Sequence, residues 1–211
     1  MKKIVIAITL LAITLLVNFL LSNDFDKGMK AYNNGDKTKA KELFGKACNN
    51  GNIKGCYNLG FMFSNGDGVR QDKRKAKELY SKACDGEYMI GCYDLGVMFS
   101  DGDGVRQDKR KAKELYSKAC DGGNMNGCIN LGFMLDLGDG VRQDKRKAKE
   151  LYSKACDGGN MNGCSNLGAM FSDGDGVRQD KRKAKELYSK ACDGGNMAGC
   201  KYYKMLNEEG I

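Results

Sequence analysis

The sequence contains no histidine and no proline, and its cysteines never form a Cys-x-x-Cys pair. Histidine is the commonest general base and metal ligand, so its absence excludes histidine-based zinc sites. Without proline, no residue breaks a helix from within, and no proline-rich linker separates domains. We therefore expect no metal site and no cofactor.

The first 22 residues differ in composition from everything that follows. Lys2 and Lys3 precede a largely apolar run from Ile4 to Leu21, and polar residues follow directly. This pattern is typical of a secretory signal peptide. An apolar run of this length could also remain as an uncleaved membrane anchor. We expect a secreted or periplasmic protein that has no membrane contact once the signal is removed.

Ten cysteines form five pairs, with a spacing of 8 within each pair and 36 between successive pairs. A period of 36 indicates a tandem repeat of helical hairpins. Pairing at spacing 8 uses every cysteine, whereas pairing at spacing 28 leaves Cys48 and Cys200 alone. We expect five local disulfides and an oxidising destination, because reactive thiols would distinguish one pair from another. The predicted disulfide residues are Cys48, Cys56, Cys84, Cys92, Cys120, Cys128, Cys156, Cys164, Cys192 and Cys200.

Each copy of the repeat predicts two helices. Helix A is predicted from about residue 55 to 65, and Gly60 within it indicates close packing against a small residue such as Ala83. Helix B begins after Asp72, a good N-cap, and its apolar residues recur at helical spacing. It is predicted to end at Asp85 and Gly86, with the glycine suited to a left-handed cap.

A single helical hairpin cannot bury its apolar face, whereas stacked hairpins can. The predicted fold is therefore an all-α solenoid of stacked antiparallel helix pairs, with a disulfide at each step. The predicted parts are a signal peptide or anchor at 1–22, a modified N-terminal repeat at 23–50, four 36-residue repeats at 51–196 and a C-terminal capping helix at 197–211.

The copies differ mainly on one face of helix A, whereas helix B hardly varies. Variable residues four positions apart share a helix face, and a row of asparagine and aspartate residues lies beside them. Such a row can bond a peptide backbone or a ligand carbonyl; neutral drift of an exposed face is the alternative interpretation. The predicted ligand-binding groove comprises Tyr57, Asn58, Phe61, Tyr93, Asp94, Val97, Ile129, Asn130, Phe133, Leu137, Ser165, Asn166 and Ala169.

The formal net charge of +8 comes mainly from one repeated phrase, Asp-Lys-Arg-Lys-Ala-Lys. A solvated helix face is the favoured interpretation, and attraction of acidic partners or anionic surfaces is the alternative. No aromatic residue interleaves with these lysines, so nucleic acid is not an expected partner. We expect the protein to be a monomer.

The string Leu-Gly-x-Met-Phe-x-x-Gly-Asp-Gly-Val-x-x-Asp-x-x-Lys-Ala-x-Glu-Leu-Tyr-x-Lys-Ala-Cys-Asp-Gly-Gly resembles the Sel1-like repeat, a relative of the tetratricopeptide repeat. The cysteine spacing resembles that of the Helicobacter cysteine-rich protein family. This resemblance covers about residues 36–200 and implies a right-handed α-superhelix whose A helices line the concave surface. It also implies secretion, one disulfide per helix pair, penicillin binding and weak β-lactamase activity.

No motif in the sequence supports a known route of β-lactam hydrolysis. That reaction needs an activated serine or a zinc-bound water, and the Ser-x-x-Lys and Lys-Thr-Gly motifs are both absent. The catalytic residues are therefore unknown. A calcium loop at Asp101 and Asp103 is disfavoured, because Ala112 occupies the position where a glutamate is expected.

Two classes of function follow from these observations. The first is a scaffold that binds a peptide, a protein or a cell-wall or β-lactam ligand in the groove. The second is a β-lactamase that hydrolyses penicillins or cephalosporins through an unrecognised site.

Overall fold

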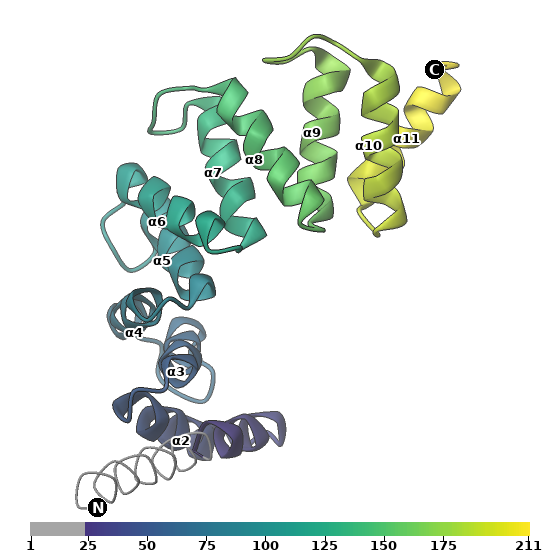
Figure 1. Cartoon of the computed structure of the whole chain (residues 1–211). Helices are drawn as coiled ribbons and strands as arrows, with labels where there is room; N and C mark the ends of the chain where they lie inside the picture. Colours follow the sequence, from purple (N-terminus) through teal and green to yellow (C-terminus); the bar gives the residue numbers. More distant parts are fainter. Residues whose placement is uncertain (1–23) are drawn as a thin grey trace, which may run out of the picture. The chain divides into compact units, whose positions relative to one another are not determined.

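The computed structural model describes residues 24–211, so the predicted signal peptide or anchor lies outside the described residues. All regular secondary structure in this range is helical. A helical segment at 24–33 comes first, and the helices labelled in Figure 1 follow it. They are α2 (Lys37–Asn49), α3 (Ile53–Asn65), α4 (Lys73–Asp85), α5 (Met89–Asp101), α6 (Lys109–Asp121), α7 (Met125–Leu137), α8 (Lys145–Asp157), α9 (Met161–Asp173), α10 (Lys181–Asp193) and α11 (Met197–Glu208).

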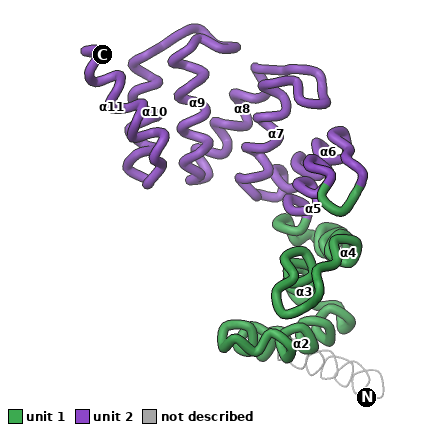
Figure 2. The backbone as a smooth tube through the Cα atoms, turned by 180° about the vertical axis from the view of Figure 1, so that it is seen from behind, with its two compact units in different colours: residues 1–91, 103–105 green, residues 92–102, 106–211 purple. Residues whose placement is uncertain are grey.

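The described chain forms two compact units, which Figure 2 colours separately. Unit 1 contains residues up to Gly91 together with Asp103–Val105, and unit 2 contains Cys92–Gly102 together with Arg106–Ile211. In unit 1, α3 packs against both α2 and α4; in unit 2, each helix from α6 to α11 packs against the next. Each unit is thus a stack of antiparallel helix pairs, which confirms the predicted all-α class and its stacked hairpins.

Side-chain caps fix where the helices begin. The Asp72 carboxylate accepts a hydrogen bond of 3.1 Å from the Lys75 amide at the start of α4. The same cap recurs at the starts of α6, α8 and α10. The Asn52 side chain accepts from the Gly55 amide at the start of α3. Such caps pair amides that have no partner within the helix, and each contributes about 1 kcal/mol.

The left-handed residue after helix B lies one position later than predicted. Gly86 has a φ of −81°, because its amide still bonds the Lys82 carbonyl and completes the last helical turn. The left-handed conformation is instead taken by Glu87, which has a φ of 60°. Glycine takes this position after the other B helices, as Gly51, Gly123, Gly159 and Gly195. A non-glycine residue in this conformation costs about 1–2 kcal/mol.

The glycine in the middle of helix A packs against a tyrosine ring, so the prediction that it meets Ala83 is wrong. A Cβ atom at Gly60 would lie 3.0 Å from Cδ1 of Tyr80. Ala83 instead meets Gly91, where an added Cβ would lie 2.7 Å from the alanine Cβ. Each copy of helix A has a glycine near its start and another in its middle, such as Gly91 and Gly96 in α5. The sequence alone does not indicate which of the two faces the tyrosine.

Disulfides join the end of a helix B to the start of the next helix A. Four of the predicted pairs are present, with Cα atoms 4.4–4.6 Å apart, namely Cys48–Cys56, Cys120–Cys128, Cys156–Cys164 and Cys192–Cys200. Cys84 and Cys92 are disulfide-bonded as well, and residues 24–211 contain no free cysteine. The disulfides therefore fix the path between successive repeats.

An ion pair ties each turn between helices A and B to the helix B before it. Lys73 Nζ lies 2.6 Å from the Asp103 carboxylate in unit 1, and Lys109 Nζ lies 2.6 Å from that of Asp139 in unit 2. These side chains are partly exposed, so each pair contributes at most about 1 kcal/mol. The pairing gives Asp103 a structural role in the turn.

Candidate functional site

The candidate site is the face of helix A on which the copies differ, and it has a part in each unit. Tyr57, Asn58 and Phe61 lie on α3 in unit 1. The other predicted residues lie on α5, α7 and α9 in unit 2, and they are Tyr93, Asp94, Val97, Ile129, Asn130, Phe133, Leu137, Ser165, Asn166 and Ala169.

On α7 this face is apolar and exposed. Phe133 is 51% exposed and Leu137 is 60% exposed, while Ile129 is half-buried. The three side chains are four positions apart and therefore share one side of the helix. Phe61, at the equivalent position in unit 1, is exposed as well. Large apolar side chains that gather on a surface mark contact sites.

The predicted groove tyrosines pack against aromatic rings of the neighbouring helices. The Tyr57 ring centroid lies 5.6 Å from that of Tyr80, and the Tyr93 centroid lies 5.9 Å from that of Tyr116. Both groove tyrosines are half-buried, as are Asp94 and Val97. Ser165 is buried, so its side chain offers little surface to a ligand.

The amides of the predicted polar row differ in what they bond. The Asn58 amide donates a 2.8 Å hydrogen bond to a carbonyl of its own helix. The Asn130 side chain hydrogen-bonds the side chains of Tyr93 and Tyr116. Asn166 is half-buried and makes no side-chain hydrogen bond within residues 24–211. Asn166 is thus the amide of the row that is available to a ligand.

A small pocket lies in unit 2 among residues of α9, α10 and α11. Its volume is about 210 Å³. Ala169 lines it, at the repeat position where the other copies carry phenylalanine or valine, and the short side chain leaves the space open. The other lining residues include Asp173, Tyr188, Tyr202 and Met205. This pocket extends the predicted groove toward the C-terminal helix.

Asp136 on α7 is a candidate that sequence reasoning missed. Serine occupies the equivalent positions 64, 100 and 172, and this difference between copies could have identified it. Its Oδ1 atom is buried without a hydrogen-bond partner. Burial raises the pKa of the Asp136 carboxyl, and the charge of Asp175 raises it further. A buried acceptor without a partner is unusual, because nearly all buried polar atoms in proteins are hydrogen-bonded.

Five segments of the sequence match the Sel1 repeat, at residues 27–52, 53–88, 90–124, 126–160 and 162–196. These segments cover most of the chain. The chain belongs to the Sel1 repeat family. The resemblance drawn from the repeated string is therefore confirmed.

Solved structures share the fold of this Sel1 repeat protein. It is similar to c5321, a protective antigen of uropathogenic Escherichia coli with an SLR fold, at 30% identity and a TM-score of 0.82, over 90% of this chain and 42% of that one. It is also similar to cysteine rich protein B (hcpB) of Helicobacter pylori, at 35% identity and a TM-score of 0.51, over 63% of this chain and 95% of that one.

A curated relative bears the name "Putative beta-lactamase HcpE" and comes from Helicobacter pylori strain J99. The two sequences are 46% identical over 43 residues, which is 20% of this chain. The match spans only 12% of the length of HcpE. The stacked hairpins and these relatives support a protein-binding scaffold, because repeat solenoids present extended binding surfaces.

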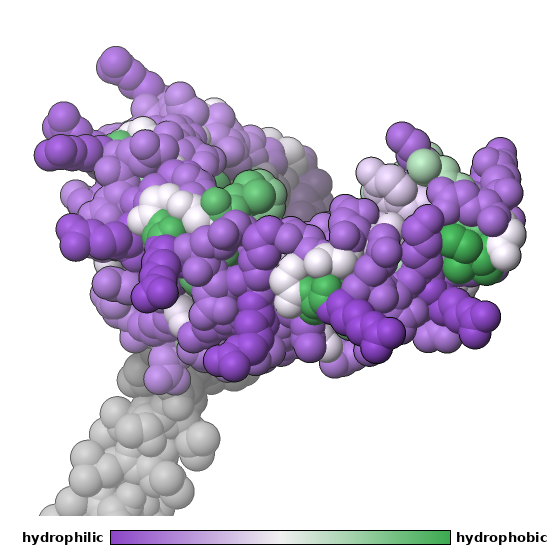
Figure 3. All heavy atoms as spheres, turned by 90° about the horizontal axis from the view of Figure 1, so that it is seen from above, coloured by the Kyte–Doolittle hydropathy of each residue, from purple (hydrophilic) through white to green (hydrophobic). Residues whose placement is uncertain are grey.

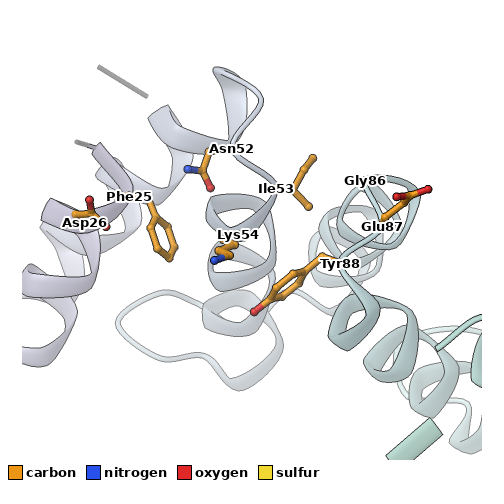
Figure 4. A pocket seen from close by; sticks show the side chains of 8 residues that line it. All are labelled: Phe25, Asp26, Asn52, Ile53, Lys54, Gly86, Glu87 and Tyr88. Carbon is orange, nitrogen blue, oxygen red and sulfur yellow. The ribbon is translucent and has the colours of Figure 1, made fainter. Parts of the chain in front are cut away.

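A second pocket of this Sel1 repeat protein lies in unit 1, with a volume of about 520 Å³. Figure 4 shows that its side chains come from the N-terminal helical segment, the start of α3 and the turn before α5. Tyr88 precedes α5 at the repeat position that Asn52 occupies before α3. The centroid of its ring lies 5.1 Å from that of the Tyr57 ring. The strained Glu87 is beside it in the same turn.

The described residues contain neither a membrane-spanning helix nor a metal-binding cluster. No helix within residues 24–211 combines the length and the apolar character that a membrane crossing requires. The same residues hold no cluster of three or more cysteine or carboxylate side chains placed to bind a metal ion.

The stability of this Sel1 repeat protein is expected to fall between about pH 10 and pH 12. Burial, then the charges of Asp173 and Tyr202, raise the pKa of Tyr188 to about 12. Tyr188 therefore keeps its proton in the folded state at a pH where the unfolded chain loses it. Its contribution to the free energy of unfolding is complete below the unfolded pKa of about 10 and is lost as the pH rises.

Urea unfolding measured at several pH values in this range checks the expectation. The Tyr188→Phe variant is the control, because it cannot titrate and should show a shallower fall with pH. Equal slopes for the two proteins would contradict the role of Tyr188.

Proposed function

We propose that the protein is a secreted or periplasmic scaffold that binds a peptide or protein segment on the variable face of helix A. The observation that carries this proposal is the apolar row of Ile129, Phe133 and Leu137 on α7, of which Phe133 and Leu137 are exposed. An extended peptide would place apolar side chains against this row. One of its backbone amides would donate to the side-chain oxygen of Asn166, which is half-buried and has no hydrogen-bond partner within residues 24–211.

The location outside the cytosol is supported by the disulfides. Every cysteine of residues 24–211 is disulfide-bonded, and such bonds persist in oxidising compartments. The positively charged pair Lys2 and Lys3, followed by an apolar run, supports export as well.

Selection of peptides from a random displayed library against the oxidised protein tests the scaffold proposal. The variant Phe133→Ala/Leu137→Ala is expected to bind the selected peptides about tenfold more weakly or worse, since two apolar contacts are lost. Met197→Ala is the matched control, because Met197 is 84% exposed but lies outside the variable face. Equal binding by all three proteins would place the ligand elsewhere.

A second candidate function is binding of β-lactams with weak hydrolysis. The name of the HcpE relative supports it, whereas the absence of Ser-x-x-Lys and Lys-Thr-Gly does not. The pocket beside Ala169 is large enough for part of such a ligand, and Asp173, Tyr188 and Tyr202 are among the residues that line it. No residue of the chain is assigned as its nucleophile.

Turnover of a chromogenic cephalosporin and labelling by a fluorescent penicillin test the second function. The variant Ala169→Phe fills the pocket and should abolish both signals if the pocket is the site. Signals that persist unchanged in Ala169→Phe exclude this pocket, and signals that disappear on further purification indicate a contaminating enzyme.

A further inference from the structure

The arginines of the chain lie on a surface that the variable face does not explain. All of them occur in the repeated phrase Val-Arg-Gln-Asp-Lys-Arg, and they are Arg70, Arg74, Arg106, Arg110, Arg142, Arg146, Arg178 and Arg182. Every one is exposed, and within residues 24–211 none forms an ion pair. The lysine between them, by contrast, is paired with a turn aspartate in three copies and with Glu209 in the last. The lysine thus has a carboxylate partner within the fold, whereas the arginine side chains remain available to a ligand.

In unit 1 these arginines border a cleft of about 630 Å³. Arg70, Arg74, Lys75 and Lys41 bring four positive charges to it. The Lys75 ammonium lies 5.0 Å from the centroid of the Phe63 ring, which also lines the cleft. The one carboxylate in its lining caps α4 and is already engaged by a backbone amide. Positive charge therefore dominates the cleft.

Unit 2 contains a cleft of the same construction, also of about 630 Å³. Arg146, Lys149, Arg178 and Lys183 line it, and the Lys183 ammonium lies 4.5 Å from the centroid of the Phe171 ring. In both clefts the loop is held by a glutamine amide that donates a 2.8 Å hydrogen bond to a serine carbonyl. The two clefts thus share the loop, the phenylalanine ring and most of the cationic positions, although Arg146 in unit 2 comes from the preceding helix B.

We propose that these clefts bind an acidic polysaccharide, whose carboxylate or sulfate groups are held by the arginine side chains. The guanidinium group presents a planar fork of donors that matches such groups in a bidentate way. Each unit contains one such cleft lined by several cationic side chains, and this suits a polymer whose charged groups recur along its length. An acidic peptide of irregular sequence would gain less from two clefts of such similar charge.

The surroundings of the clefts disfavour the other large polyanions. None of the large exposed apolar side chains of residues 24–211 lines either cleft, so a membrane surface would find no side chain to bury. The aromatic ring in each cleft is covered by a lysine and is not free to stack on a base. Figure 3 shows a face on which hydrophilic residues dominate and hydrophobic ones form small separate patches.

Heparin, a sulfated polysaccharide, is the probe for this proposal, with the full oxidised protein and titration calorimetry. Replacing the four arginines that line the two clefts, as Arg70→Gln, Arg74→Gln, Arg146→Gln and Arg178→Gln together, is expected to weaken binding about tenfold or more, since each arginine contributes charge-assisted hydrogen bonds. The matched control is Lys27→Gln, Lys54→Gln, Lys190→Gln and Lys204→Gln, which removes the same charge from exposed lysines outside the clefts.

Binding that falls far more in the arginine variant than in the lysine variant supports the proposal. An equal fall in both would show attraction by net charge alone and would overturn it. Replacing the same four arginines by lysine should also weaken binding, because the charge stays but the fork is lost. Tighter binding of double-stranded DNA or of phosphatidylserine vesicles than of heparin would assign the clefts to those ligands instead.

Discussion

Gly163→Ala is expected to destabilise the protein by about 1–3 kcal/mol, the usual cost of overpacking a core. Gly163 is buried near the start of α9, against the last turn of α8. An added Cβ would lie 2.7 Å from the Cβ of Ala155 and 2.8 Å from the backbone nitrogen of Cys156. Backbone atoms cannot move aside as a flexible side chain can, and the Cys156–Cys164 disulfide holds the two helices together at this point.

Whether Gly163→Ala lowers or raises the stability shows whether packing or helix propensity dominates at this position. Alanine is favoured over glycine by about 1 kcal/mol within a helix, so propensity alone predicts a gain in stability. Gly45 is the matched control, because it lies within α2 and an added Cβ there would meet no atom within 4 Å. Urea unfolding should show a loss for Gly163→Ala and a gain for Gly45→Ala. A gain at both positions would contradict the packing argument.

Removing the disulfide between α8 and α9, by Cys156→Ala and Cys164→Ala together, is expected to cost about 2–3 kcal/mol. The bond closes a loop with a sequence separation of 8 and restricts the unfolded chain. Both cysteines are buried, so the shorter alanine side chains also leave unfilled space in the core. Denaturant unfolding of the variant and the parent protein measures the difference.

The exposure of the cysteines predicts the order in which a reductant breaks the disulfides. Cys192 and Cys200 are partly exposed, whereas Cys156 and Cys164 are buried. Under limiting reductant, alkylation followed by peptide mass mapping should label Cys192 and Cys200 first.

A variant without the Cys156–Cys164 bond that unfolds like the parent protein would show that the helix packing alone holds the repeats together.

Much of the fold could be predicted because its signals are local. The caps at Asp72 and Asn52 act on amides three residues away, and the helix boundaries follow from them. The cysteine spacing predicted the pairing seen in the Cys48–Cys56 bond, because two helices joined by a short turn bring residues at this spacing together. The period of 36 predicted a stack of hairpins, since each hairpin has an apolar face that only a neighbour can cover.

The candidate site was harder to predict, because its surface depends on contacts between helices. The copies differ at Tyr57 and Tyr93, yet these rings pack against tyrosines of helix B and are only half exposed. Asp136 differs from its counterparts by one residue type, but only the folded chain buries its oxygen without a partner. The pocket beside Ala169 forms only where α11 closes the stack.

The sequence by itself determined the helices, their caps, the repeat length and the cysteine pairs, because each depends on residues close together in the chain. Only the tertiary structure decided which glycine of helix A meets Tyr80, and which residue after helix B takes the left-handed conformation. It also decided which charges stay unpaired. These outcomes depend on how side chains from different repeats share space, and no local pattern of residue types specifies that.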